Sequence, residues 1–312
     1  MQKNISNSKI NTKTELERSL STFITKLPFY NKLKDFCNYI NNSGKIRLVG
    51  GCVRDFILNK IPNDIDLSSD LEPNIIMELA KKYGAKTIPT GIEHGTVTVI
   101  LDNLSIEITT LRYDVKCDGR HAIIQFTNDF YEDAKRRDFT INAMSFCLLE
   151  NKLFDYFDGI THLKESKVIF IGDAKQRICE DYLRILRFFR FTSYYAKEID
   201  LTGYESCLEL AYNLNKISQE RITSELNKTF DNTKNLNYIL QYLQNIFPYI
   251  NLPKYENKYK LLKKIDIFSS NYKKKIDEIC LNLNLNIKNL NNINTYNIVY
   301  LFYLKIWIFC KK

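Results

Sequence analysis

The stretch LVGGCVRD at 48–55, followed by DID at 64–66, decides the fold of the N-terminal half of this chain. The first run predicts a strand that ends in paired glycines and continues as a helix. Such glycines let a phosphate approach the backbone closely, and the helix N-terminus presents free N–H groups to it. Arg54, one turn into the helix, adds a guanidinium fork for the same phosphates. A Gly-Gly pair alone is more often a plain tight turn, so the prediction depends on the DID run behind it.

The DID run predicts a metal site. In a strand, Asp64 and Asp66 point to one face and Ile65 points to the other. Adjacent carboxylates repel, and hard oxygen ligands that leave room for water and substrate phosphates suit Mg²⁺. Glu107, in the predicted strand 105–111, is a candidate third carboxylate that either binds metal or helps to deprotonate an attacking hydroxyl. The alternative, a solvated strand edge, is common for an isolated DxD pair but fits poorly behind the Gly-Gly turn.

Two arginine-rich runs lie further along the chain. RRDFTINA at 136–143 places adjacent cations and an acid at the predicted start of an apolar helix, with Asp138 as a cap or as the partner of an arginine. EDYLRILRFFR at 180–190 spaces Asp181, Arg184 and Arg187 three residues apart, which predicts a polar ridge on one helix. A structural ladder of ion pairs is the alternative. Several arginines on so apolar a helix nevertheless require anionic or hydrogen-bonding partners.

The chain has 312 residues, 45% hydrophobic and 26% charged, which predicts a globular protein of about two domains. Strand and turn signals fill the front, at 46–51, 63–69, 95–101 and 105–111, whereas a helical period begins near residue 180. The fold class is therefore α+β, with a mixed front and an all-helical rear. Residues 204–312 hold sixteen Lys and Arg against nine Asp and Glu, a net +7 of the total +9. This excess favours a polyanionic partner, with a solvated lysine-rich surface as the alternative.

Other classes of protein fit the sequence poorly. The eight cysteines are scattered singly without a CxxC pair, which disfavours a disulfide framework or a zinc ribbon and favours the cytoplasm. The N-terminus is polar, so we expect no secretory signal. The last apolar run, 298–309, is too short to span a bilayer and contains Lys305. We expect no membrane association, and no obligatory protein partner is evident.

Taken in order, LVGGCVRD, DID, RRDFTINA, EDYLRILRFFRF and ISQERITSEL resemble the class II tRNA nucleotidyltransferases, the bacterial CCA-adding enzymes, whose superfamily includes bacterial poly(A) polymerases. The resemblance runs from about residue 47 to about residue 230. It implies a polymerase-β-like nucleotidyltransferase head followed by an all-α neck, body and tail. We expect a polar N-terminal extension at 1–25, the head at 26–158, a helical neck with the nucleotide-selecting helix at 159–232, and a tRNA-binding body and tail at 233–312. The part beyond the ISQERITSEL motif is short for a body that grips the tRNA elbow.

The resemblance also implies residue roles. Two Mg²⁺ ions on Asp64 and Asp66 would align a tRNA 3′-hydroxyl with the α-phosphate of CTP or ATP and stabilise the pyrophosphate leaving group, with Glu107 completing the catalytic set. The residues expected to bind nucleotide are Gly50, Gly51, Arg54, Arg137, Asp138, Asp181, Arg184, Arg187 and Arg190. A flexible loop at 114–122, which CCA-adding and A-adding enzymes carry and CC-adding enzymes lack, contains Asp114, Asp118, Gly119 and Arg120.

The predicted function is template-independent addition of CCA to tRNA 3′ ends. The nearest alternative is an A-adding enzyme or a poly(A) polymerase of the same fold. An alternative of another class is a non-catalytic RNA-binding module. Clustered carboxylates disfavour that last alternative, because they repel RNA phosphates and serve no purpose without catalysis.

Overall fold

The computed structural model describes residues 13–117, 122–231, 236–243 and 245–250. The chain divides into two compact units, the first formed by Met1–Asp181 with Tyr195–Gly203 and the second by Tyr182–Tyr194 with Tyr204–Lys312. The domain boundaries expected at 25, 158 and 232 stay predictions. In the described part of the chain, we find no helix with the length and apolar character that a membrane crossing requires.

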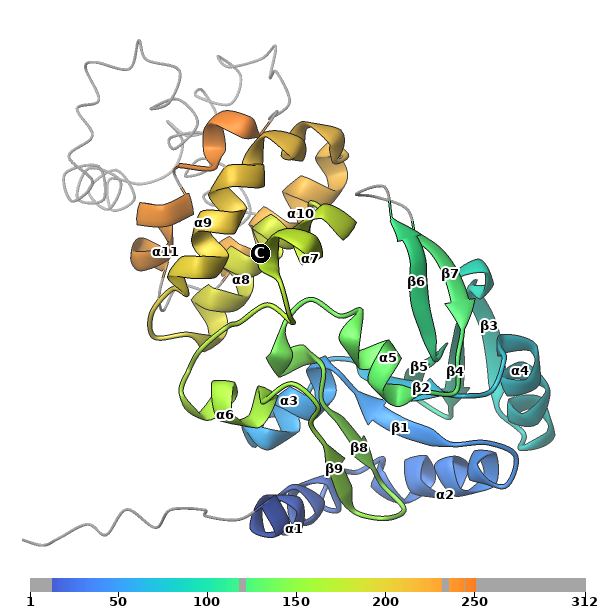
Figure 1. Ribbon diagram of the computed structural model, residues 1–312. Coiled ribbons are helices and arrows are strands. Elements are labelled where there is room, and N and C mark those ends of the chain that lie inside the picture. Colours follow the sequence, from blue (N-terminus) through green and yellow to red (C-terminus); the bar gives the residue numbers. More distant parts are fainter. Residues whose placement is uncertain (1–12, 118–121, 232–235, 244, 251–312) are drawn as a thin grey trace, which may run out of the picture. The chain divides into compact units, whose positions relative to one another are not determined.

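A seven-stranded sheet forms the centre of the first unit, with the strand order β3-β4-β5-β2-β1-β8-β9 (Figure 1). The strands are β1 (Ile46–Val49), β2 (Ile65–Ser69), β3 (Lys86–Gly91), β4 (Thr96–Leu101), β5 (Leu104–Thr110), β8 (Ser145–Cys147) and β9 (Lys152–Phe154). Neighbouring strands are antiparallel except β2 and β5, which run parallel with Asp66 opposite Glu107. The four predicted strands are confirmed as β1, β2, β4 and β5, whereas β3, β8 and β9 were not predicted.

The described part of the first unit also contains seven helices. They are α1 (Lys13–Ile24), α2 (Tyr30–Asn41), α3 (Gly51–Ile57), α4 (Pro73–Lys82), α5 (Phe130–Lys135), α6 (Gly159–Lys164) and α7 (Ala174–Glu180), with the short 3₁₀ helices η1 (Ile92–His94) and η2 (Thr140–Asn142). Of these, α1 to α4 contact strands of this sheet. In α1, Leu16, Leu20 and Ile24 are buried at a spacing of four residues, which places them on one face against α3 and β9. The strand-turn-helix predicted from the Gly-Gly run is confirmed as β1 followed directly by α3.

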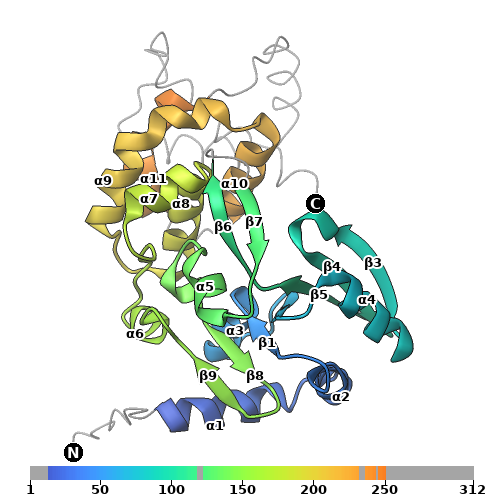
Figure 2. The same cartoon turned by 45° about the vertical axis from the view of Figure 1, so that its right-hand side comes forward.

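A separate two-stranded ribbon, β6 (Arg112–Cys117) and β7 (Ala122–Phe126), follows β5. Figure 2 shows it extending away from the seven-stranded sheet. Of the predicted flexible loop, Asp114 lies in β6, while Asp118, Gly119 and Arg120 lie outside the described residues. Residues 114–117 and residue 122 of the expected loop therefore belong to the two strands of a hairpin.

The run at 136–143 does not begin an apolar helix, contrary to our prediction. Helix α5 ends at Lys135, and the chain then passes through η2 into β8. The Asp138 carboxylate accepts hydrogen bonds from the backbone N–H of Phe139 at 2.8 Å and from the Asn142 amide at 3.1 Å. Such local bonds compete with helical ones, and the apolar residues are buried because β8 pairs with β1.

The second unit is helical, as predicted. Its elements are α8 (Arg184–Tyr195), α9 (Leu201–Leu210), η3 (Ala211–Lys216), α10 (Gln219–Asp231), α11 (Leu236–Leu243) and η4 (Phe247–Tyr249), with the end of α8 and the start of α9 assigned to the first unit. Edge-to-face aromatic contacts join α8, α9 and α11, because the ring centroid of Tyr204 lies 6.2 Å from that of Phe189 and 5.1 Å from that of Tyr242. The predicted helix at 180–190 is in fact divided, since α7 ends at Glu180 and Asp181 is extended, with φ −151°.

Helix α6 approaches η2 so closely that glycine is required at position 159. A β-carbon there would lie 2.4 Å from the carbonyl oxygen of Thr140. We expect Gly159→Ala to lower the free energy of unfolding by about 1–3 kcal/mol, because the backbone must shift to relieve the overlap. The measurement is urea unfolding followed by circular dichroism.

Gly91→Ala is the matched control, because a β-carbon at Gly91 would be in ordinary contact with Thr96 at 3.6 Å and the backbone there is extended, with φ −171°. Equal losses of stability in the two variants would contradict this account of the packing between α6 and η2.

Candidate active site

Three carboxylates meet on one face of the sheet. Asp64 precedes β2 and is exposed, Ile65 is buried beneath the sheet surface, and Asp66 is half-buried. Parallel pairing of β2 with β5 sets the exposed Glu107 directly opposite Asp66. The alternation predicted for the DID run is therefore observed, and the pairing brings in a carboxylate from 41 residues further along the chain.

The crowding of these carboxylates changes the acidity of Asp66. Burial, and then the negative charge of Glu107, raise the pKa of Asp66 to about 6, with a smaller contribution from Asp64, although Arg137 acts in the opposite direction. A dication is the ordinary means of relieving such repulsion. Among the residues that the structure describes, no group of three or more histidine, cysteine or acidic side chains is arranged to hold a metal ion. Two carboxylates do fit Mg²⁺, which keeps several waters and completes its shell with substrate phosphates.

Arg137 lies beside the paired glycines. Gly50 has φ +71°, a backbone conformation that favours glycine, and a β-carbon on it would lie 2.8 Å from Nη1 of Arg137. The other terminal nitrogen of Arg137 donates to the hydroxyl of Ser68 at 3.5 Å, and Ser68 is two residues beyond Asp66 on β2. The guanidinium therefore lies between the glycine turn and the strand that carries the carboxylates.

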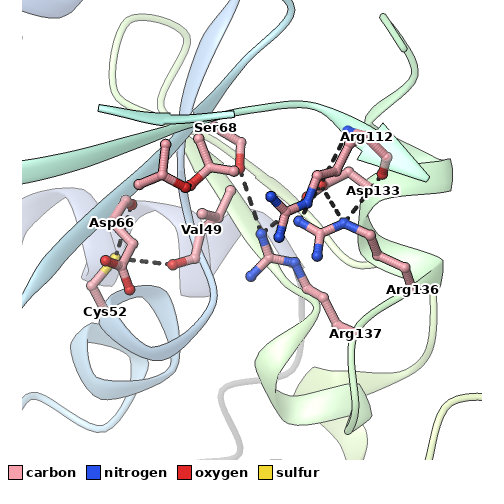
Figure 3. Close-up of polar contacts among 10 residues, drawn as sticks. Val49, Cys52, Asp66, Ser68, Arg112, Asp133, Arg136 and Arg137 are labelled. Atoms are coloured by element: carbon pink, nitrogen blue, oxygen red, sulfur yellow. Dashed lines mark hydrogen bonds and ion pairs between the residues drawn. The ribbon is translucent and has the colours of Figure 1, made fainter. Parts of the chain in front are cut away.

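Asp133 of α5 holds this guanidinium in place (Figure 3). Its carboxylate is 2% exposed and accepts hydrogen bonds from Nη2 of Arg137 at 3.0 Å and from Nε and Nη2 of Arg136 at 2.9 and 2.7 Å. Burial alone would raise the pKa of Asp133, but the charges and hydrogen bonds of Arg137 and Arg136 outweigh it and hold that pKa below its ordinary value. Asp133 is therefore ionised at neutral pH and anchors both arginines.

Arg54 is embedded in a second network of the first unit. It is 6% exposed, forms an ion pair with Asp55 at 2.9 Å, and lies over the ring of Tyr195. Its Nη1 donates to the Asn142 side-chain oxygen at 2.5 Å, and Asn142 in turn donates to Asp138. Asp138 therefore acts on Arg54 through Asn142, and the predicted role of Arg54 toward phosphate stays a prediction.

In the second unit, Glu225 of α10 receives two of the predicted arginines. Its buried carboxylate accepts a hydrogen bond from Nε of Arg190 at 2.6 Å, and Nη1 of Arg187 lies 4.0 Å from its other oxygen. The anionic partner that we expected for the arginine-rich helix is thus supplied by the ISQERITSEL run. Arg184 begins α8, and the half-buried Asp181 lies at the boundary of the first unit.

The structure adds residues that the sequence did not single out. Asp133, Ser68 and Asn142 each contact a predicted arginine. Asp133 lies three residues before Arg136 and four before Arg137, a spacing from which the pairing could have been inferred, whereas a serine in a strand carries no motif by itself. Asn142 is inside a recognised motif, so its involvement could have been inferred from the spacing of four from Asp138.

Comparisons with known proteins agree with this geometry. Residues 46–169 match the family described as the poly A polymerase head domain. The human mitochondrial CCA tRNA nucleotidyltransferase 1 is 42% identical over 243 residues, which are 74% of this chain and 55% of the relative. The CCA-adding enzyme of Oceanobacillus iheyensis is 37% identical over 218 residues, 68% of this chain and 53% of the relative. The chain thus spans a little more than half the length of these curated relatives.

Solved structures give the same result. The Bacillus stearothermophilus CCA-adding enzyme in complex with CTP superposes with a TM-score of 0.64 at 28% identity, covering 76% of this chain and 57% of the other. The Thermotoga maritima CCA-adding enzyme complexed with tRNA gives a TM-score of 0.64 at 22% identity, covers 91% of this chain and 65% of the other, and supports the fold alone. Residues 46–169 therefore match the poly A polymerase head domain, and the resemblance of the chain to the CCA-adding tRNA nucleotidyltransferases is confirmed.

Proposed function

We propose that this protein adds nucleotides to the 3′ end of tRNA without a template, completing the sequence CCA from CTP and ATP. The observation that carries the proposal is the carboxylate cluster of Asp64, Asp66 and Glu107 beside the anchored guanidinium of Arg137. Relatives named for CCA addition support it, although they are longer than this chain. The basic excess at 204–312 is a proposed tRNA contact, and 251–312 lies outside the described residues.

In the proposed reaction, the 3′-oxygen of the RNA forms a bond to the α-phosphorus of the nucleotide, the bond from that phosphorus to the β-phosphate oxygen breaks, and pyrophosphate leaves. Asp64 and Asp66 would hold Mg²⁺, which when bound neutralises phosphate charge and makes the attacking hydroxyl more acidic. Glu107, which is exposed opposite Asp66, would accept the hydroxyl proton. Arg137 would offset the negative charge that develops on the phosphates.

The alternatives are separated by one assay. Purified protein is incubated with tRNA that ends at the discriminator base, with CTP and ATP supplied separately and together. CCA addition requires both nucleotides on this tRNA, and a poly(A) polymerase extends it with ATP alone. A second tRNA that already ends in CC detects an A-adding enzyme, which extends only that tRNA with ATP, whereas a non-catalytic module extends neither. The compartment is a proposal too: cysteine usage favours the cytoplasm, while one relative is mitochondrial by name.

The carboxylate assignment predicts opposite changes in activity and stability. Asp66→Asn should lower the rate of nucleotide addition by at least about 100-fold, because charge stabilisation worth several kcal/mol is lost. The same change should leave Tm unchanged or higher. A carboxylate whose pKa is raised in the folded state opposes folding at neutral pH, and Asn removes that charge.

Asp102→Asn is the control, because Asp102 is an exposed acid of the same unit that pairs with Lys32. It should retain full activity. Near-normal addition by Asp66→Asn in Mg²⁺ would show that the carboxylates are not catalytic.

Asp181 and Arg184 are proposed to read the incoming base. Cytosine and adenine share an exocyclic amino donor beside a ring-nitrogen acceptor, whereas uracil and guanine present the reverse pattern. A carboxylate accepts from the amino group and a guanidinium donates to the ring nitrogen. Each mismatch leaves a desolvated group unpaired, at about 1–3 kcal/mol.

The double variant Asp181→Ala with Arg184→Ala should therefore raise the use of UTP and GTP relative to CTP and ATP. Competition assays with all four nucleotides measure this ratio. Glu198→Ala, an exposed change shortly after the end of α8, serves as the control. A uniform loss of all four nucleotides would mean that the pair is structural.

A further inference from the structure

A third guanidinium, that of Arg112, lies beside the two that bind Asp133 (Figure 3). Arg112 is the first residue of β6. Its backbone N–H donates to the Asp133 carboxylate at 3.4 Å, and its carbonyl accepts a hydrogen bond from Nε of Arg136 at 3.1 Å. The backbone of Arg112 is thus fixed to the Asp133 cluster, which we define as Asp133, Arg136, Arg137 and Arg112.

The side chain of Arg112 does not share in the pairing. Its Nε and Nη1 are enclosed and find no hydrogen-bond acceptor among the described residues. Arg136 and Arg137 already use both carboxylate oxygens of Asp133, one oxygen each. Enclosed donors without an acceptor cost stability, and such a group in a folded protein calls for an explanation.

The charges around Arg112 do not balance either. Burial, and then the positive charge of Arg136, lower the pKa of Arg112 to about 10, although Asp114 and Asp133 partly oppose this. Arg112 is still charged at neutral pH. Three guanidinium groups and two carboxylates leave the surroundings with one excess positive charge. An anion would satisfy both the unpaired donors and this charge.

We propose that Arg112 binds a phosphate group of a substrate together with Arg137. Within the Asp133 cluster, Arg137 is the member that also lies beside Gly50 and donates to Ser68. Ser68 is on β2, the strand that carries Asp66, where a phosphate of the reaction would lie. Arg112 is partly exposed, and no hydrogen bond that we observe restrains its guanidinium, so turning it toward an anion breaks no existing bond. The inference rests on the proposed function, and it adds a residue that no motif contains.

The phosphate has two sources, the triphosphate of the nucleotide or the backbone of the RNA end. Binding is measured by calorimetry in two arms, one with inorganic tripolyphosphate and one with an RNA oligonucleotide ending in CC. The variants are Arg112→Met, which removes the charge at similar length, and Arg112→Lys, which keeps the charge without the fork. Lys135→Met is the matched control, because Lys135 is an exposed cation of α5 that pairs with Glu132 at the surface.

We expect Arg112→Met to weaken binding about 10- to 100-fold in one of the two arms, as for loss of a hydrogen bond between charged groups. Loss in the tripolyphosphate arm assigns the phosphate to the nucleotide, and loss in the RNA arm assigns it to the acceptor end. Arg112→Lys should be intermediate and Lys135→Met unchanged. Wild-type affinity of Arg112→Met in both arms overturns the proposal, as does a wild-type protein that binds neither compound.

Thermal unfolding separates this role from a structural one. A cation with unpaired donors beside other cations opposes folding, so Arg112→Met should keep or raise Tm while phosphate affinity falls. If the Tm of Arg112→Met falls so far that unfolding explains the loss of affinity, Arg112 is a structural residue and does not bind phosphate. The binding arms need no catalysis, so failure of nucleotide addition by the wild type would refute the proposed function without deciding this one.

Discussion

The arrangement of the candidate site depends on the ion pairs that the carboxylate of Asp133 forms with Arg136 and Arg137. This carboxylate is almost fully buried, and a buried charge is tolerated because two guanidinium groups compensate it. This pairing fixes the position of the Arg137 guanidinium, beside Gly50 and Ser68. Position 50 favours glycine because its φ is +71°, and Nη1 of Arg137 lies 2.8 Å from where a β-carbon would be.

As a consequence, negative charge gathers on the sheet and positive charge gathers beside it, around α5. Negative groups gather at Asp66 and Glu107, where burial and repulsion raise the pKa of Asp66, while positive charge exceeds negative charge around Asp133. Within these two clusters, the charged forms of Asp66 and Arg112 oppose folding when nothing is bound, because the pKa of Asp66 is raised and that of Arg112 is lowered. A nucleotide with its magnesium ions carries both complementary charges, so its binding would relieve both. The extensive apolar core that the sheet and helices of this unit bury offsets the resulting loss of stability.

A similar device occurs in the second unit. Glu225 is buried and accepts a hydrogen bond from Arg190, with Arg187 at a longer distance, so one carboxylate again orders two arginines, for which the family resemblance implies nucleotide binding. In the first unit the acid lies three and four residues before its arginines, and in the second it comes from a different helix, but in both a carboxylate fixes guanidinium groups in advance. Preorganised cations of this kind act on a charged substrate without a cost of rearrangement at the moment of reaction.

The sequence by itself determined the α+β class, the strand-turn-helix at 46–57, four strands of the sheet and the helical rear, because each of these is encoded by local periodicity and turn residues. It also identified Asp64 and Asp66, whose side chains share a face by strand alternation alone. Tertiary structure decided the rest. The apolar run after Arg137 became a strand because it pairs with β1, and the helix expected from Glu180 divided at Asp181. Asp133 meets Arg136 and Arg137 at the local spacings of three and four residues. Arg112 joins them only because the start of β6 packs against α5, and no local pattern encodes that contact between segments 21 residues apart.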